Sequence, residues 1–170
     1  MSRGEAERSG LVLYRTYPIG TLGLMEDGQG LSRVFLRREG VEYRFPEGET
    51  PLTAQAAGEL EEYFDRRRSA FTVPLSPHGT RFQLAVWQAL RDIPYGQTRT
   101  YGETAAAVGR PRAARAVGMA NHDNPLLIMI PCHRVVGKNG ALTGFACGLE
   151  VKRRLLELEG ARVSQSKILR

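Results

Sequence analysis

The stretch TYGETAAAVGRPRAARAVGMA, residues 100–120, decides how the second half of this chain folds. Thr100 and Glu103 fit a capping box, in which a threonine caps the start of a helix and a glutamate three residues later reaches back to it. The sequence GRP at 109–111 breaks this helix, and a second helical pattern runs from about 111 to 120. Two short helices joined by a tight break predict a helix-turn-helix, although many helical hairpins of these proportions never touch DNA.

The second helix of the pair has an unusual composition. Small side chains permit a helix, which is about 10–12 Å across, to approach phosphates and a widened minor groove, since this groove is only about 6 Å wide in B-DNA. An arginine among them is then able to enter the base stack. A close helix–helix contact would also suit small residues, and composition leaves both interpretations open. The long cationic residues are Arg112 and Arg115, and the small ones are Ala113, Ala114, Ala116, Gly118 and Ala120.

Helical patterns continue on both sides of this pair. Residues 80–93 place apolar side chains at helical spacing around Trp87, and residues 148–160 form an amphipathic helix with Val151, Leu155 and Leu158 on one side. The tail, residues 161–170, has no clear periodicity, and we predict that it is mobile.

The first half of the chain has a different pattern. Three strand-like runs at 11–17, 21–27 and 31–38 predict a small antiparallel meander. Residues 50–68 are rich in helix formers and open with Thr50-Pro51, a good cap and first-turn pair. FTVPL at 71–75 is a candidate last strand, and SPHGT at 76–80 a candidate linker. We therefore predict an α+β fold, with a supporting domain at 1–75 that holds a small antiparallel sheet and a helix, and a mostly helical domain at 76–170 that contains the helix-turn-helix.

Charge separates the same two halves. Of the 170 residues, 1–75 hold 10 basic and 12 acidic side chains, whereas 76–170 hold 14 basic and 6 acidic ones, so the net charge of +6 arises wholly in the second half. Such an excess attracts a polyanion such as nucleic acid, but it also fits a solvated basic surface. No secretory signal or membrane-spanning run is visible, and we expect a cytoplasmic protein. Two cysteines and three scattered histidines oppose a disulfide framework and a structural zinc site.

The run IMIPCHRVVG, residues 128–137, places one of the two cysteines in apolar surroundings. A cysteine in such a run is usually a small buried hydrophobe. Here, however, Cys132 is followed by His133 and Arg134, and positive neighbours lower a thiol pKa and favour the reactive thiolate. A histidine can accept the thiol proton directly or through water, and a carboxylate can orient the histidine. Glu159, near the end of the last helix, is the candidate carboxylate.

The segment NPLLIMIPCHRVVGKNGALTGFACGLEVKRRLLELEG, residues 124–160, resembles the active-site region of the O6-alkylguanine-DNA alkyltransferases, also called methylated-DNA–protein-cysteine methyltransferases. The motif PCHRV at 131–135 is highly specific, and Asn124-Pro125 and the ARAVGMA segment also match. The resemblance extends from about 82 to 160 and is much weaker before it. It implies direct, irreversible transfer of the alkyl group from O6-alkylguanine, and from O4-alkylthymine, in double-stranded DNA to a cysteine. Base flipping, a single turnover, no cofactor, no metal and a monomeric state are implied as well.

The resemblance also implies roles for matching residues. Cys132 resembles the acceptor thiol, His133 its general base through a bridging water, and Glu159 the carboxylate that orients His133. Tyr101 resembles the tyrosine that helps to rotate the nucleotide and protonates the leaving guanine, and Arg115 the finger that fills the gap in the duplex. The expected DNA contacts further include Thr100, Arg112 and Ala114, and the expected hinge and pocket residues are Asn124, Pro131, Val135, Phe145, Ala146, Cys147, Gly148 and Lys152.

The loop TGFACGLE departs from the family pattern. Phe145 keeps an aromatic ring without a hydroxyl, Ala146 lacks the hydroxyl that many members carry, and Cys147 adds a second thiol. Cys147 either alters access for bulky adducts, reacts with a neighbour, or is a tolerated small residue, which is the interpretation that we favour. His78 and His122 are expected at the surface or in packing.

Two other classes of function stay open at this point. A lesion-binding protein similar to the alkyltransferase-like proteins would bind damaged DNA without transfer, but those proteins replace the acceptor cysteine. A Cys-His hydrolase built from Cys132, His133 and Glu159 would turn over and would need an oxyanion hole, for which the sequence offers no evidence.

Overall fold

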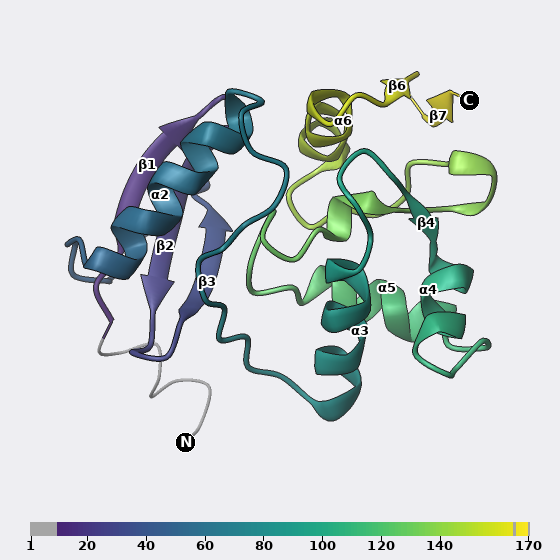
Figure 1. Ribbon diagram of the computed structural model, residues 1–170, viewed down its shortest axis with the longest axis horizontal. Helices are drawn as coiled ribbons and strands as arrows, with labels where there is room; N and C mark the ends of the chain where they lie inside the picture. Colours follow the sequence, from purple (N-terminus) through teal and green to yellow (C-terminus); the bar gives the residue numbers. More distant parts are fainter. Residues whose placement is uncertain (1–9, 165, 170) are drawn as a thin grey trace. The chain divides into compact units, whose positions relative to one another are not determined.

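The computed structural model describes residues 10–164 and 166–169. Its contacts fall into two compact units, Met1–His78 and Gly79–Arg170 (Figure 1). The first unit holds a three-stranded sheet and one long helix, whereas helices dominate the second. The predicted α+β class is therefore confirmed.

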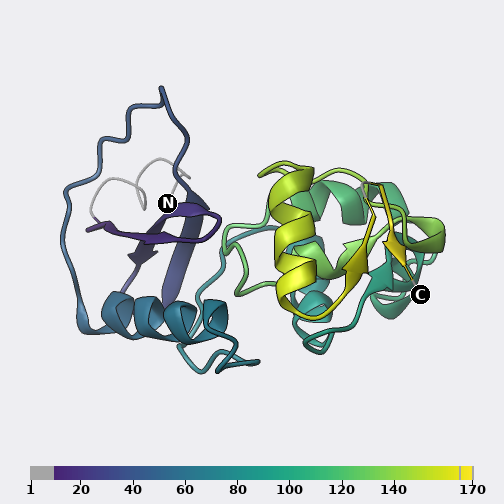
Figure 2. The same ribbon diagram turned by 90° about the horizontal axis from the view of Figure 1, so that it is seen from above.

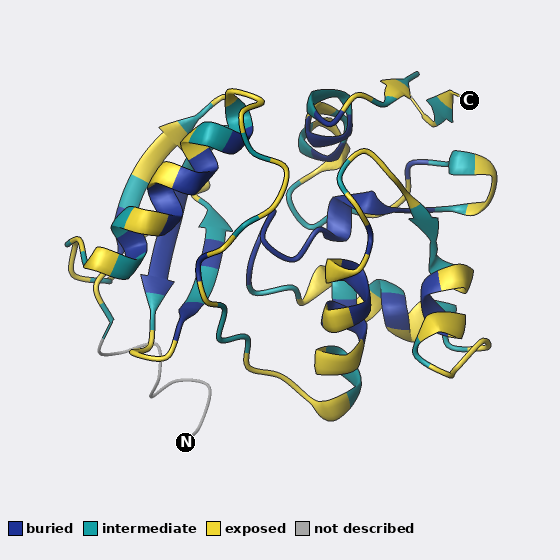
Figure 3. Cartoon of the chain, in the orientation of Figure 1, coloured by how far each residue is buried: buried dark blue, intermediate teal, exposed yellow. Residues whose placement is uncertain are grey.

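The sheet of the first unit is an antiparallel meander of strands β1 (Leu13–Tyr17), β2 (Gly20–Glu26) and β3 (Leu31–Leu36). Helix α2 (Pro51–Phe64) covers one face of it, as Figure 2 shows. Thr50 caps this helix in a box closed by Thr53, and Pro51 occupies its first turn, where a missing N–H costs nothing. The core of this unit forms where the buried side of α2 meets the central strand β2 (Figure 3).

The candidate strand FTVPL is wrong. Residues 71–75 make only an isolated bridge between Leu75 and Leu31. Leu31 donates its N–H to the carbonyl of Pro74, at 2.8 Å, and Ser76 donates to the carbonyl of Leu31, also at 2.8 Å. Pro74 itself has no N–H to extend such a ladder, which limits the pairing.

The second unit is built around a helix-turn-helix. Trp87 of α3 (Arg81–Arg91) is buried, and its Nε1 donates to the carbonyl of Ala120 in α5 (Ala114–His122), at 2.8 Å, which joins these two helices. The strand before α4 pairs in parallel with the strand after Cys132, through Arg99 with Val135 and Thr100 with Val136. In chain order the elements are α3 (Arg81–Arg91), β4 (Arg99–Thr100), α4 (Tyr101–Ala107), α5 (Ala114–His122), η1 (Cys132–Arg134), β5 (Val135–Val136), η2 (Lys138–Gly140), α6 (Leu149–Leu158), β6 (Arg162–Val163) and β7 (Ile168–Leu169).

The prediction of a mobile tail is wrong for the part of the tail that the structure describes. Strands β6 and β7 pair antiparallel, Arg162 with Leu169 and Val163 with Ile168 (Figure 2). Ile168 packs on a buried cluster of Val136, Leu142 and Leu156. The tail lacks periodicity because only a few of its side chains are apolar, and these pack on residues distant in sequence.

Candidate active site

The helix-turn-helix places Tyr101 at the start of α4. The predicted capping box is present: Thr100 Oγ1 accepts from the Glu103 N–H at 3.1 Å, and the Glu103 carboxylate accepts from the Thr100 N–H at 2.7 Å. Gly118 of α5 lies beside the Tyr101 ring, since a Cβ added there would stand 3.9 Å from it. The two helices are thus closely packed at the residues expected to meet DNA.

The long side chains of α5 and of the turn before it point outward. Arg112, Arg115 and Met119 are exposed, Met119 to 62%, while Val117 and Ala120 are buried. The small residues of α5 divide between its two sides. Ala120 is buried, as a close helix–helix contact requires, and Ala116 is exposed beside Arg115, where an approach to DNA would need a small side chain.

The apolar run before Cys132 is a compact turn rather than a strand. Met129 donates to the carbonyl of Leu127 at 2.9 Å, with Ile128 between them at φ 71°. A β-branched residue in the left-handed region costs about 1–3 kcal/mol and persists only where its surroundings fix it. Here Leu126–Cys132 are all buried. A second tight turn follows, in which Cys132 donates its N–H to the carbonyl of Ile130 at 2.8 Å.

Asn124 ties this turn to the thiol. Its Nδ2 donates to the carbonyl of Ile130 at 2.8 Å and to Sγ of Cys132 at 3.1 Å, while its Oδ1 accepts from the N–H of Leu126 at 2.9 Å. All the polar atoms of its amide are engaged. Asn124 follows α5 by two residues, so it links the helix directly to the position of Cys132.

His133 and Glu159 form a buried pair. His133 Nε2 lies 2.7 Å from Glu159 Oε1, and the imidazole is fully buried. A carboxylate accepts hydrogen bonds, so Nε2 carries the hydrogen and Nδ1 keeps its lone pair. Among the described residues, Nδ1 has no hydrogen-bond partner. Burial lowers the pKa of His133, against the opposing effect of Glu159, so the imidazole rests neutral and able to accept a proton.

Arg134, expected only as a positive neighbour of the thiol, binds Glu159 instead. Its guanidinium is buried and binds Glu159 twice, Nε to Oε2 and Nη2 to Oε1, both at 2.9 Å. Nη1 donates to the carbonyl of Ile93 at 2.6 Å. The position of this arginine in an apolar run could have indicated the pair with Glu159. A buried guanidinium requires a carboxylate partner, and Glu159 was already the candidate carboxylate for His133.

The expectation that positive neighbours lower the pKa of the Cys132 thiol is wrong. Burial raises the pKa of Cys132 to about 11, and the hydrogen bond from Asn124 and the charge of Lys152 offset this only in part. Arg134 does not contribute, because its charge is directed at Glu159. The thiol therefore needs a base at the moment of reaction.

Lys152 connects three parts of the site. Its buried Nζ donates to the carbonyl of Val135 at 2.6 Å and to that of Thr143 at 3.1 Å. The same ammonium lies 5.8 Å from the centres of the Tyr101 and Phe145 rings. Burial lowers the pKa of Lys152 to about 8, with Cys132 opposing. The lysine thus fixes the residues after Cys132 to the loop at 143–148.

That loop lies beside Tyr101. The Tyr101 hydroxyl donates to the carbonyl of Thr143 at 3.3 Å, and the N–H of Gly148 donates to the carbonyl of Phe145 at 2.9 Å, closing a turn with Cys147 inside it. Cys147 is half-buried, and its thiol is close enough to raise the pKa of Cys132.

The structure thus brings together Tyr101, Asn124, Cys132, His133 and Glu159 with Lys152 and the loop at 143–148, and Pro131 and Val135 are buried beside the thiol. Arg112, Ala114 and Arg115 are not joined to this group by any described contact; they lie at the α5 surface. The described residues hold no cluster of three metal-ligating side chains, and His78 and His122 are both largely exposed. No helix in the described ranges is long and apolar enough to span a bilayer.

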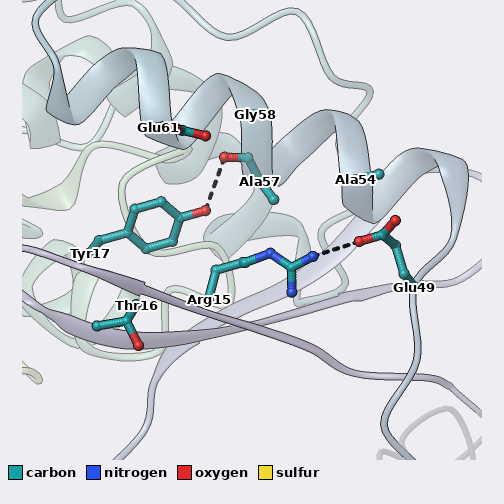
Figure 4. A pocket seen from close by; sticks show the side chains of 8 residues that line it. All are labelled: Arg15, Thr16, Tyr17, Glu49, Ala54, Ala57, Gly58 and Glu61. Carbon is teal, nitrogen blue, oxygen red and sulfur yellow. Dashed lines mark hydrogen bonds and ion pairs between the residues drawn. The ribbon is translucent and has the colours of Figure 1, made fainter.

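A separate cavity of about 430 Å³ lies in the first unit between β1 and α2 (Figure 4). Its most polar feature is an ion pair of Arg15 with Glu49, 2.7 Å apart, and Tyr17 donates there to the carbonyl of Ala57 at 3.0 Å. The lining contains no thiol or imidazole, and its cation is already paired, so we assign no chemistry to it. The lining residues are Arg15, Thr16, Tyr17, Glu49, Ala54, Ala57, Gly58 and Glu61.

Comparisons with known proteins point in one direction. Residues 81–161 match the model of the 6-O-methylguanine DNA methyltransferase, DNA binding domain. The chain is 47% identical over 147 residues to a methylated-DNA–protein-cysteine methyltransferase of Methanosarcina acetivorans. This alignment covers 85% of this chain and 94% of the relative. A crystal structure of the Mycobacterium tuberculosis O6-methylguanine methyltransferase aligns with a TM-score of 0.82 at 41% identity, over 92% of this chain and 96% of that one. A structure of Mycobacterium tuberculosis OGT in complex with DNA aligns with a TM-score of 0.80 at 42% identity, over 87% and 91%.

Proposed function

The chain belongs to the methylated-DNA–protein-cysteine methyltransferase family, and from this premise we propose that it repairs O6-alkylguanine in double-stranded DNA by moving the alkyl group onto its own Cys132. The observation that carries the proposal is the buried His133–Glu159 pair next to that thiol in the chain. His133 Nδ1 is free to accept a proton, and the Nε2 hydrogen is held by Glu159.

The transfer step follows from these groups. As Sγ of Cys132 attacks the alkyl carbon, the thiol proton passes to His133 Nδ1, directly or through one water, and Glu159 stabilises the resulting imidazolium. The carbon–O6 bond breaks as the carbon–sulfur bond forms. Guanine leaves with the electron pair and takes a proton from the Tyr101 hydroxyl, which lies at the loop at 143–148. Asn124 holds the sulfur in place by its hydrogen bond.

The product explains why each molecule acts once. A thioether on Cys132 has no leaving group comparable to guanine, and no hydrolytic residue faces it among the groups assigned here. The proposed reaction is therefore stoichiometric and uses no cofactor. O4-alkylthymine presents the same alkyl–oxygen bond, and we include it among the substrates.

DNA engagement follows from the α5 surface. The target atom lies inside the duplex, so the nucleotide must rotate out, at a cost of a few kcal/mol. Arg115 is exposed on α5 with Ala116 beside it, which suits insertion into the gap. We assign phosphate contacts to Arg112 and to the start of α5, because positive and small residues there suit a close approach to the DNA backbone. Thr100 contributes by capping α4 beneath Tyr101. We expect a monomer that acts on DNA in the cytoplasm.

One experiment tests the acceptor assignment. The protein is incubated with a duplex that contains one O6-methylguanine, its intact mass is measured, and the modified peptide is mapped. We expect a single methyl group on Cys132 and none in Cys132→Ser. In the matched control Cys147→Ser, the methyl group should still appear on Cys132. Tight binding without a mass change would instead indicate a lesion-binding protein, and repeated turnover of an ester would indicate a hydrolase.

A second experiment tests the finger assignment. Arg115→Ala should weaken transfer from duplex DNA about tenfold or more, because rotation of the nucleotide loses its support, while transfer from free O6-benzylguanine stays within about twofold. Arg110→Ala is the control for loss of one positive charge near the same helices. An equal loss on both substrates in Arg115→Ala would reject the assignment.

A further inference from the structure

Arg134 and His133 share one oxygen of Glu159. Oε1 accepts from His133 Nε2 at 2.7 Å and from Arg134 Nη2 at 2.9 Å, and Oε2 accepts from Arg134 Nε at 2.9 Å. We propose that Arg134 is a positioning residue that keeps His133 neutral at rest, because it competes with the imidazole as the cation partner of Glu159. This inference rests on the proposed function, since it concerns the base of that reaction.

The guanidinium is fixed in this position by two further contacts. Nη1 donates to the carbonyl of Ile93 at 2.6 Å, and the guanidinium carbon lies 5.8 Å from the centre of the Tyr95 ring. The Tyr95 hydroxyl in turn donates to the carbonyl of Leu158, at 3.2 Å, next to Glu159. Arg134 is only 6% exposed and Glu159 is equally buried, so water cannot replace either partner.

Competition for a buried carboxylate determines where the proton lies. A buried glutamate requires a positive partner, and in this site both a guanidinium and an imidazolium are able to serve. The guanidinium is permanently charged, so it neutralises Glu159 while His133 stays uncharged. Without Arg134, Glu159 would stabilise the imidazolium alone, and His133 would bind a proton at higher pH. A protonated His133 cannot accept the proton of Cys132.

The other charged groups around His133 do not supply this balance. Lys152, from α6, lies near enough to lower the pKa of His133, but it donates to the carbonyls of Val135 and Thr143 and not to Glu159. Cys132, next in the chain, is a neutral thiol at rest. The other element packed on η1 is α3. Its last residue, Arg91, and the next residue, Asp92, are both exposed. Among these groups, Arg134 is therefore the permanent cation that binds Glu159.

The test compares Arg134→Gln, which removes the charge, with Arg134→Lys, which keeps it. The ring nitrogens of His133 are followed by ¹⁵N NMR from pH 4.5 to 9, and single-turnover transfer from free O6-benzylguanine is measured over the same range. In Arg134→Gln we expect the His133 midpoint to rise by about one pH unit or more, and transfer at pH 6 to fall about threefold or more and recover at pH 8.5. In Arg134→Lys the midpoint should stay within about 0.3 pH units of the parent value.

Each outcome decides the inference. A uniform loss of rate in Arg134→Gln, with an unchanged His133 midpoint, would show a merely structural arginine and reject it. The parent protein gives a test that needs no variant to fold: its His133 should remain neutral at pH 6, and a parent imidazole already protonated at that pH would also reject the proposal. The NMR titration does not depend on alkyl transfer, so failure of the proposed function would be recognised separately by the absence of any transfer in the parent.

Discussion

Glu59 in the first unit and Glu159 in the second are both buried glutamates, but their hydrogen-bond partners differ in kind. Glu59 accepts from the N–H of Thr72 at 2.8 Å, from the N–H of Val73 at 3.2 Å, from Gln55 Nε2 at 3.0 Å and from the Thr72 hydroxyl, and all of these hydrogen-bond donors are neutral. A guanidinium, that of Arg68, lies only at ion-pair distance, with Nη1 4.0 Å from Glu59 Oε2. Glu159 accepts instead from an imidazole and a guanidinium.

The difference decides what each carboxylate can do. Burial raises the pKa of both groups, but the hydrogen bonds outweigh it, so the pKa of Glu59 ends below its usual range and that of Glu159 at about 2. The donors to Glu59 keep their protons near neutral pH, so this residue only fastens α2 to residues 72–73. Glu159 has a partner that can gain a proton, and it is therefore suited to stabilise the charge that forms during transfer.

The largest effect expected from this comparison is on the transfer rate. Glu159→Gln should slow single-turnover methyl transfer from a duplex with O6-methylguanine about a hundredfold or more, because an amide cannot stabilise the imidazolium. Glu59→Gln, the matched change in the first unit, should stay within about twofold of the parent. Both are measured by intact mass over time, at a temperature where circular dichroism shows each variant folded. Similar losses in the two variants would contradict the distinction.

A second prediction concerns the thiol of Cys132, which depends on the His133–Glu159 pair to lose its proton. In Cys147→Ser, where Cys132 is the remaining cysteine, reaction with iodoacetamide at pH 8 should be about a hundredfold slower in the native protein than in urea. Burial raises the pKa of Cys132 to about 11, so little thiolate is present in the folded state. The complementary variant, Cys132→Ser, reports Cys147 alone. Rapid native labelling of Cys132 would show that it is a thiolate at rest.

Stability offers a smaller contrast. Glu59→Gln should lower the free energy of unfolding by about 1–3 kcal/mol, because one carboxylate oxygen becomes an amide N–H₂ that faces buried donors. Urea denaturation checks this value. Glu61→Gln is the control on the exposed side of α2 and should change stability by less than about 0.5 kcal/mol. Equal effects of the two changes would mean that the Glu59 network contributes nothing to stability.

The smallest predicted effect is a change in the free energy of unfolding with pH, which begins at a different pH for His133 than for the two glutamates. Burial lowers the pKa of His133, so below about pH 6.5 the unfolded chain binds a proton that the folded chain does not, and stability falls with falling pH. Glu59 and Glu159 have lowered pKa values, so their contributions are complete above about pH 4.5 and are lost only in more acidic solution.

Urea unfolding at pH 6.5 and 5.5 measures this difference. The parent should lose about 1 kcal/mol between these two values, and His133→Asn should lose clearly less, while Glu59→Gln should show the parent slope. A parent curve that is flat down to pH 4.5 would contradict a neutral His133.

The sequence predicted the local features of the fold and several members of the site. Thr50-Pro51 and the Thr100–Glu103 box correctly marked helix starts, because a cap involves residues only three positions apart. The pairing of His133 with Glu159 also agrees with the structure, but it came from the family resemblance and from Glu159 as a candidate carboxylate. Spacing in the sequence carried no information that these two residues would meet.

The features that the sequence missed all depend on distant contacts. Ile128 adopts a left-handed turn because the surrounding residues are buried, against its own preference for extended backbone. Cys132 rests as a thiol because desolvation exceeds the effect of nearby charge, and Arg134 is directed to Glu159 and Ile93 rather than to the sulfur.

The sequence by itself therefore determined the α+β class, the helix-turn-helix and the identity of the reactive segment, since these follow from periodicity, caps and a specific motif over short spans. Only the tertiary structure decided which charge acts on which group. One buried cluster joins residues 93, 133, 134 and 159. Because its surroundings have low polarity, each charged group there needs a fixed set of hydrogen-bond partners. The protonation state of His133 is a property of that cluster and of no segment alone.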